Sequence, residues 1–220
     1  MSKIQAVVFD MDGVLVDSEV LWRQVREEFA RDLGKVWDAD SQVATMGVST
    51  RDWSRIMQER MALDMSCEEI ARQIKSRLIQ HYEQHLPVRP GALEAVRTAA
   101  SRYKVALASA SPTELVYWIM DYTGLRPLFQ AVGLGDEVRR GKPDPEIYLK
   151  VLADLGVHPE NAVGVEDSGN GIRAVHAAGM HVIAAPSPEF QLPAEIAAMA
   201  DRVIHSLEEF SLEMVEGLER

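Results

Sequence analysis

The sequence has few of the features that mark secreted or membrane proteins. Its 220 residues include a single cysteine, Cys67, which excludes an intramolecular disulfide and a zinc site built on a pair of cysteines. No apolar run approaches the roughly 18 residues that a membrane-spanning helix needs. The apolar run at the start of the chain, IQAVVF, is too short for a secretory signal. We therefore expect a cytoplasmic protein that does not bind membranes.

Positive charge is also scarce. The 23 lysines and arginines are outnumbered by 34 aspartates and glutamates, which gives a formal net charge of −11. This balance disfavours general binding to nucleic acid. It does not exclude a small anionic ligand, because local donors and metal ions can reverse the field inside a cleft. We expect no nucleic-acid partner, and a monomer or a weak homo-oligomer.

Short apolar runs alternate with helical patterns along most of the chain. Because the runs are apolar on both faces, they are typical of parallel strands covered by helices on each side. This succession predicts an α/β protein with a doubly wound parallel sheet. The expected strands are 4–9, 104–109, 131–135, 162–166, 181–185 and 202–205.

The stretch 16–88 interrupts this alternation. It contains no convincing strand, and its patterns predict helices over 18–34, 50–63 and 66–85, with Ser18 as a candidate N-cap of the first. We therefore expect residues 1–15 and 89–220 to form the α/β core and residues 16–88 to form a helical cap. An insert after the first strand lies beside the carboxyl ends of the strands, where open sheets bind ligands. It could act as a lid.

Residues whose side chains can act in catalysis or bind a ligand follow four of the expected strands. They are Asp10 and Asp12 in VVFDMDG, Ser109 in LASAS, Lys142 in RRGKPDP, and Glu166 and Asp167 in VGVEDSG. The ends of parallel strands converge, so several carboxylates would share a small volume. Two unit charges about 4 Å apart interact by roughly 4 kcal/mol at an effective dielectric constant near 20, so the cluster needs compensation. Oxygen ligands of this kind suit Mg²⁺, and the lysine and serine suit a phosphoryl group.

These motifs, in this order, resemble the haloacid dehalogenase superfamily in its phosphatase and phosphomutase branch. The resemblance covers essentially the whole chain: DxDG followed by a helical cap, a strand-end serine, a GKP lysine and an ED pair. It implies that Asp10 attacks phosphorus and forms an aspartyl-phosphate. It implies that Asp12 acts as general acid and then general base. Dehalogenases of the same superfamily need no acid at the second position, so Asp12 points to phosphoryl transfer.

The resemblance also implies a metal site and a substrate site. Mg²⁺ would be held by Asp10, the main-chain carbonyl of Asp12 and Asp167, with Glu166 close by or ligating. Catalysis would use Asp10, Asp12, Ser109 and Lys142. The expected substrate contacts are Asp12, Gly13, Ser109, Ala110, Lys142, Trp22 and Arg51.

The reaction that follows phosphoryl capture depends on the cap. Relatives resembling β-phosphoglucomutase carry a cap histidine where this chain has Trp22, and an arginine after a Gly-Val-Ser turn where it has Thr50, with Arg51 one step later. These departures favour hydrolysis of a small sugar phosphate, because relatives that hydrolyse hexose phosphates carry a similar DSE-x-LW segment. A phosphomutase and a phosphoglycolate phosphatase remain alternatives.

A receiver-type signalling module is a further alternative, since receivers also combine acidic residues, a hydroxyl and a lysine at parallel-strand ends. Two features argue against it. Asp12 would shorten the life of a phospho-aspartate, and receivers lack a helical insert such as 16–88.

Overall fold

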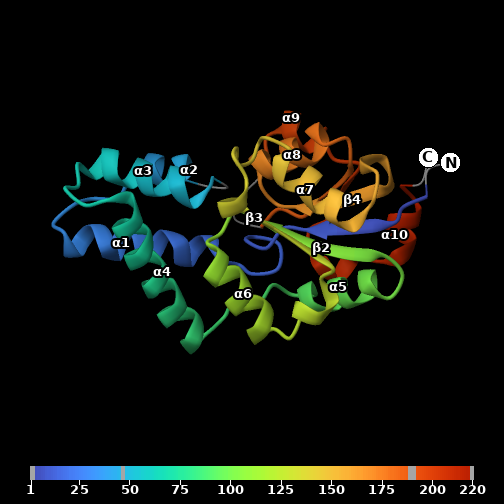
Figure 1. The fold of residues 1–220 in the computed structure, drawn as a ribbon, viewed down its shortest axis with the longest axis horizontal. Coiled ribbons are helices and arrows are strands. Elements are labelled where there is room, and N and C mark those ends of the chain that lie inside the picture. The colour runs from blue at the N-terminus through green and yellow to red at the C-terminus, as the bar shows by residue number, and fades with distance from the viewer. Residues whose placement is uncertain (1–2, 46–47, 188–191, 219–220) are drawn as a thin grey trace.

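A six-stranded parallel sheet forms the centre of the larger part of the molecule (Figure 1). The structure, a computed structural model, describes residues 3–45, 48–187 and 192–218. The strand order is β3-β2-β1-β4-β5-β6, with every pair parallel. The strands are β1 (Ala6–Phe9), β2 (Lys104–Ser109), β3 (Ala131–Leu134), β4 (Ala162–Glu166), β5 (His181–Ala184) and β6 (Arg202–Val203). All six expected strands are present, and the doubly wound α/β fold is confirmed.

Helices cover both faces of this sheet. Successive side chains of β1 point to opposite faces: Val7 and Phe9 belong to one buried apolar cluster, and Ala6 and Val8 belong to the other. Both faces of the sheet are therefore buried under apolar side chains, as the uniformly apolar strands predict. The flanking helices are α5 (Ala92–Ala100), α6 (Thr113–Tyr122), α7 (Glu146–Leu155), α8 (Gly169–Ala177), α9 (Ala194–Ala197) and α10 (Leu212–Glu216), with short 3-10 helices η1 (Arg126–Leu128), η2 (Gly135–Glu137), η3 (Pro159–Asn161) and η4 (Leu207–Glu209).

Four helices follow β1 and lie together to one side of the sheet, drawn blue to green in Figure 1. They are α1 (Glu19–Asp32), α2 (Ala39–Ala44), α3 (Thr50–Met61) and α4 (Cys67–Gln84). Three of them match the predicted helices, while α2 was not predicted. Ser66 caps α4 by accepting from the backbone N–H of Glu69. The helical insert is confirmed, and the bounds 16 and 88 of a separate cap domain stay a prediction.

The chain crosses between the sheet and these helices through two neighbouring segments. Val16 and Val88 form an isolated antiparallel bridge. Beside it, the backbone N–H of Asp17 donates to the carbonyl of Pro87 at 2.8 Å. The two crossings therefore hold each other in register. Among the described residues, no helix is long and apolar enough to cross a membrane.

Arg89, at the end of the second crossing, ties it to two loops of the sheet. The side chain is buried, and Nη1 donates to the carbonyls of Gly13 and, at 2.9 Å, of Ala185. Nη2 reaches the carbonyl of Pro186 at 3.4 Å. One guanidinium thus joins the loop after β1, the end of β5 and the return crossing.

Candidate active site

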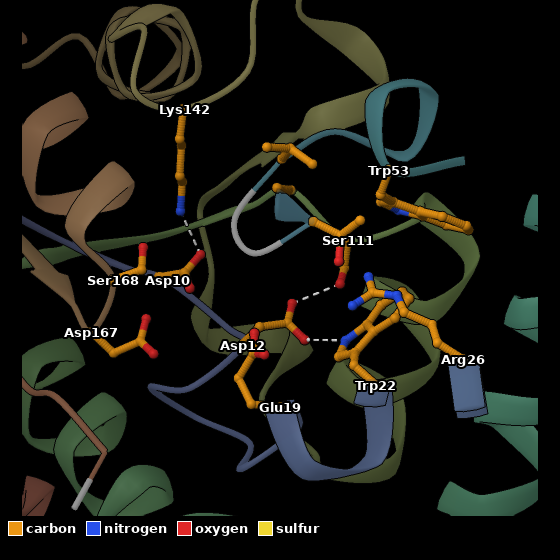
Figure 2. Close-up of a pocket in the computed structure, with 13 residues that line it drawn as sticks. Asp10, Asp12, Glu19, Trp22, Arg26, Trp53, Ser111, Lys142, Asp167 and Ser168 are labelled. Atoms are coloured by element: carbon orange, nitrogen blue, oxygen red, sulfur yellow. Dashed lines mark hydrogen bonds and ion pairs between the residues drawn. The ribbon is translucent and has the colours of Figure 1, made fainter. Parts of the chain in front are cut away.

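The predicted residues that follow the strands lie together at the carboxyl end of the sheet. Residues at the end of β1 pair with both neighbours, Phe9 with Leu107 of β2 and with Val165 of β4. Asp10 and Glu166 therefore end adjacent strands at nearly the same level. The pocket there is lined on the sheet side by Asp10, Asp12, Ala110, Ser111, Lys142, Asp167 and Ser168, and on the helical side by Glu19, Trp22, Arg26, Thr45, Val48 and Trp53 (Figure 2).

Lys142 is the central cation of the sheet side. It comes from the loop between η2 and α7, and its side chain is only 3% exposed. Nζ donates to Asp10 Oδ1 at 2.6 Å, to Glu166 Oε1 at 2.5 Å and to the carbonyl of Ala108 at 3.1 Å. Burial alone would lower the pKa of Lys142, but the two carboxylates raise it well above its ordinary value. The ammonium group is therefore charged and fully bonded.

Glu166 is fully buried, and both of its oxygens are engaged. Oε1 accepts from Lys142 and, at 2.6 Å, from the hydroxyl of Tyr148. Oε2 accepts from the backbone N–H groups of Asp167 and Ser168 and from the Ser168 hydroxyl, at 3.1 to 3.3 Å. Glu166 is thus held as the acceptor that positions Lys142.

The acidic groups lie close enough to share a cation. Asp10, Glu166 and Asp167 each place one carboxylate oxygen within 4.8 Å of the others. Burial raises the pKa of Asp10 well above its ordinary value, with Lys142 opposing this shift. Burial, then Glu166 and Asp10, raises the pKa of Asp167 as well. Asp10 and Asp167 thus resist ionisation without a nearby cation, and a cluster of carboxylates around them fits a hard divalent ion such as Mg²⁺.

Asp12 accepts hydrogen bonds from both parts of the molecule. Its Oδ1 accepts from Ser18 Oγ at 2.7 Å and from Trp22 Nε1 at 3.1 Å, both on the helical side. Its Oδ2 accepts from Ser111 Oγ at 2.6 Å and from Ser109 Oγ at 3.3 Å, both after β2 (Figure 2). The carboxylate therefore has a fixed orientation beside the pocket.

Two of these contacts were not among the sequence-based expectations, and the predicted contact of Ser109 with a phosphoryl group stays a prediction. Ser18 stands at the N-cap position of α1, but its side chain makes no cap hydrogen bond and donates to Asp12 instead. Ser109 is fully buried, donates to Asp12 and accepts from the backbone N–H of Ser111. Ser111 was missed by the sequence reasoning, although its place two residues after Ser109 was the available signal.

Gly13 is required by the close approach of Asp167. Its φ of +75° favours glycine, and a Cβ at this position would lie 1.8 Å from Asp167 Oδ2. Gly171 has the same role for Glu166, because a Cβ there would lie 1.9 Å from that side chain. The acidic cluster is thus packed directly against backbone that leaves no room for a side chain.

The helical side supplies contacts that were only partly predicted. Trp22 lines the pocket, whereas Arg51 is exposed on α3 and lies outside it, and the predicted contacts of both with a substrate stay predictions. Glu19 and Arg26, both on α1, line the pocket and were not predicted. Residues 46 and 47, at the start of the turn before Thr50, lie outside the described residues.

Comparisons with known proteins show the family to which the chain is related. A model of the haloacid dehalogenase-like hydrolase family matches residues 4–179. A phosphorylated carbohydrates phosphatase of Thermotoga maritima is 36% identical over 181 residues, covering 82% of this chain and 84% of the relative. Hexitol phosphatase B of Escherichia coli (strain K12) is 33% identical over 218 residues, 98% of each chain. The crystal structure of CbbY from Rhodobacter sphaeroides in complex with phosphate superposes with a TM-score of 0.81 at 28% identity, covering 96% of this chain and 98% of that one.

The chain therefore belongs to the haloacid dehalogenase-like hydrolases. The resemblance inferred from its motifs is confirmed, and so is the predicted class of enzyme, a phosphoric monoester hydrolase.

Proposed function

We propose that this enzyme is a Mg²⁺-dependent phosphatase that hydrolyses a small sugar phosphate through an aspartyl-phosphate on Asp10. The observation that carries the proposal is the convergence of Asp10, Asp12 and Lys142 on one pocket whose acidic side also holds Asp167. The similarity to a phosphatase of phosphorylated carbohydrates and to a hexitol phosphatase supports the sugar part.

We propose that Asp10 and Asp167 hold the metal directly, together with the main-chain carbonyl of Asp12. Glu166 completes the acidic cluster, but its oxygens already accept five hydrogen bonds, so we assign it the positioning of Lys142. When bound, Mg²⁺ neutralises charge between the carboxylates and the phosphoryl oxygens.

In the first step an Asp10 oxygen attacks phosphorus and the bond from phosphorus to the sugar oxygen breaks. Asp12 gives a proton to that leaving oxygen. In the second step Asp12 takes a proton from water, whose oxygen attacks phosphorus and frees Asp10 and inorganic phosphate. Lys142 balances the charge on the phosphoryl oxygens. Ser109 and Ser111 orient Asp12, and the backbone N–H of Ala110, between them, is the proposed donor to a phosphoryl oxygen.

Phosphate release from a panel of hexose, hexitol, pentose, and two- or three-carbon phosphates tests this proposal. We expect Mg²⁺-dependent release that EDTA abolishes, and no more than a trace of activity in Asp10→Asn. Asp17→Asn is the matched control, because Asp17 is an exposed aspartate of the first crossing and is not among the described residues that line the pocket. Release that persists in Asp10→Asn would overturn the covalent route, and release that survives EDTA would overturn the metal assignment.

Transfer of the phosphoryl group to another hydroxyl is the main alternative outcome. In that case substrate would be consumed without an equal amount of inorganic phosphate. Trp22 supports hydrolysis, because its indole N–H is committed to Asp12 and its ring lines the pocket. We therefore expect one phosphate released per substrate molecule consumed.

A further inference from the structure

Three pocket residues come from one face of α1. Glu19, Trp22 and Arg26 are spaced at i, i+3 and i+7, a spacing that brings side chains to the same side of a helix. Figure 2 shows all three directed at the pocket, opposite Asp10 and Lys142. Trp22 contacts Asp12, the proposed acid at the leaving oxygen, and on that basis we place the part of the substrate beyond the phosphate beside Glu19 and Arg26.

Arg26 is a buried cation with an unused donor. It is 3% exposed, and its guanidinium carbon lies 4.7 Å from the ring centre of Trp22 and 5.8 Å from that of Trp53. Nη1 donates to Gln42 Oε1 at 3.2 Å, while the buried Nε has no hydrogen-bond partner among the residues that the structure describes. Burial lowers the pKa of Arg26 to about 10, so the group is still charged at neutral pH. The guanidinium end of Arg26 lines the pocket and is directed into it in Figure 2, so it can donate a hydrogen bond to an acceptor on a bound ligand.

Glu19 brings the opposite charge to the same place. Gln42 links the two residues, because its amide oxygen accepts from Arg26 and its NH₂ group donates to Glu19 Oε2 at 3.5 Å. Burial raises the pKa of Glu19, and Arg26 opposes that shift. The helical side of the pocket thus offers a donor next to an acceptor.

We infer that Arg26 and Glu19 form a specificity pair that selects substrates whose end remote from the phosphate is a neutral chain of hydroxyl groups and discriminates against phosphorylated acids. The inference rests on the proposed function. A hydroxyl group can accept from Arg26 and donate to Glu19. A carboxylate can only accept, and it would place a second negative charge beside Glu19 and near Asp12. The pair therefore favours phosphorylated polyols and sugars over compounds such as phosphoglycolate.

Sorbitol 6-phosphate and 6-phosphogluconate test this inference, because they differ only at the carbon farthest from the phosphate, which is a hydroxymethyl group in one and a carboxylate in the other. We expect wild-type kcat/KM to be at least about tenfold higher for the polyol. Arg26→Gln should lower kcat/KM for the polyol about 10- to 100-fold, the usual effect of losing a hydrogen bond to a charged group. The loss should be much smaller for p-nitrophenyl phosphate, which has no hydroxyl chain. Glu19→Gln should narrow the ratio between polyol and acid.

Arg23→Gln is the control, since Arg23 lies on the exposed face of α1 and pairs with Glu27. Each substrate ratio is measured on one preparation, so a partly unfolded variant still gives a valid ratio. Equal kcat/KM for the two substrates in the wild type, or equal losses for all substrates in Arg26→Gln, would overturn the inference while leaving the phosphatase proposal intact. If no substrate releases phosphate, including p-nitrophenyl phosphate, the phosphatase proposal itself fails and the inference falls with it.

Discussion

Replacing Lys142 by methionine should destabilise the fold as well as stop turnover. The side chain is 3% exposed, and its Nζ lies 2.6 Å from Asp10 Oδ1 and 2.5 Å from Glu166 Oε1. Methionine fills much of the same volume but leaves two buried carboxylates without their cation. Removing one member of a buried ion pair typically costs roughly 3 to 5 kcal/mol. We expect a loss of this size in the free energy of unfolding at pH 8.

The loss should depend on pH in a defined direction. Burial already raises the pKa of Asp10 in the wild type. Without the ammonium group the pKa of Asp10 in the folded state would rise further. The free-energy cost of ionising Asp10 in the folded state therefore grows as pH rises above the pKa of the unfolded chain, about 3.9. The destabilisation should therefore be smaller near pH 5 than at pH 8.

Urea unfolding of wild type and Lys142→Met in EDTA, at both pH values, measures this effect. Lys150→Met is the matched control, because Lys150 is 36% exposed and pairs only with exposed carboxylates, a type of contact worth about 0 to 1 kcal/mol. A loss in Lys142→Met no larger than that of the control, or one that grows as the pH is lowered, would refute the reasoning.

Three further perturbations probe other parts of the site. Gly13→Ala should severely weaken Mg²⁺ activation of phosphate release, because the added Cβ would displace the Asp167 carboxylate. Gly34→Ala is its control and should not change that activation, because Gly34 has a similar φ of +66° but no atom of the described residues within 4 Å of an added Cβ. Arg89→Lys should lower stability by about 1 to 3 kcal/mol in urea unfolding, because one ammonium cannot replace a fork that reaches three carbonyls. The raised pKa of Glu19 means that it protonates before ordinary glutamates as pH falls, so the preference for polyol over acid should narrow toward pH 5, and a pH-independent ratio of kcat/KM values would contradict this.

The sheet and its reactive edge could be predicted from sequence because the signals are local. Each strand is a short run that is apolar on both faces, and the side chain that follows it lies at the carboxyl edge of a parallel sheet. Asp10, Lys142 and Asp167 therefore needed only the strand assignments to be placed together. The helices of the insert were predicted for the same reason, except α2, whose six residues are too few for a clear periodic pattern.

The contacts made by hydroxyl groups and by the helical side could not be predicted in this way. Whether Ser18 caps α1 or bonds Asp12 depends on how the helix is placed against the sheet, which no local pattern encodes. Arg51 was chosen by its distance from a turn and stays a predicted contact, whereas Arg26, which lines the helical side of the pocket, was not predicted. The only sequence signal for Arg26 was its place next to Val25, an apolar residue of α1. The sequence does not show that the Arg26 side chain is buried, because that depends on how the helices pack.

The bridge between Val16 and Val88 gives the helical segment the topology of an oversized hairpin loop. Its ends are hydrogen-bonded neighbours, so excising the intervening residues and closing the gap with a tight turn would leave the order and direction of the strands unchanged. The shortened chain would keep Asp10, Lys142 and Asp167 but lose every contact that α1 offers to the pocket. Under the proposed roles it would also lose the hydrogen bonds that Ser18 and Trp22 donate to Asp12, so the helical segment would contribute both to the choice of substrate and to the orientation of the proposed acid.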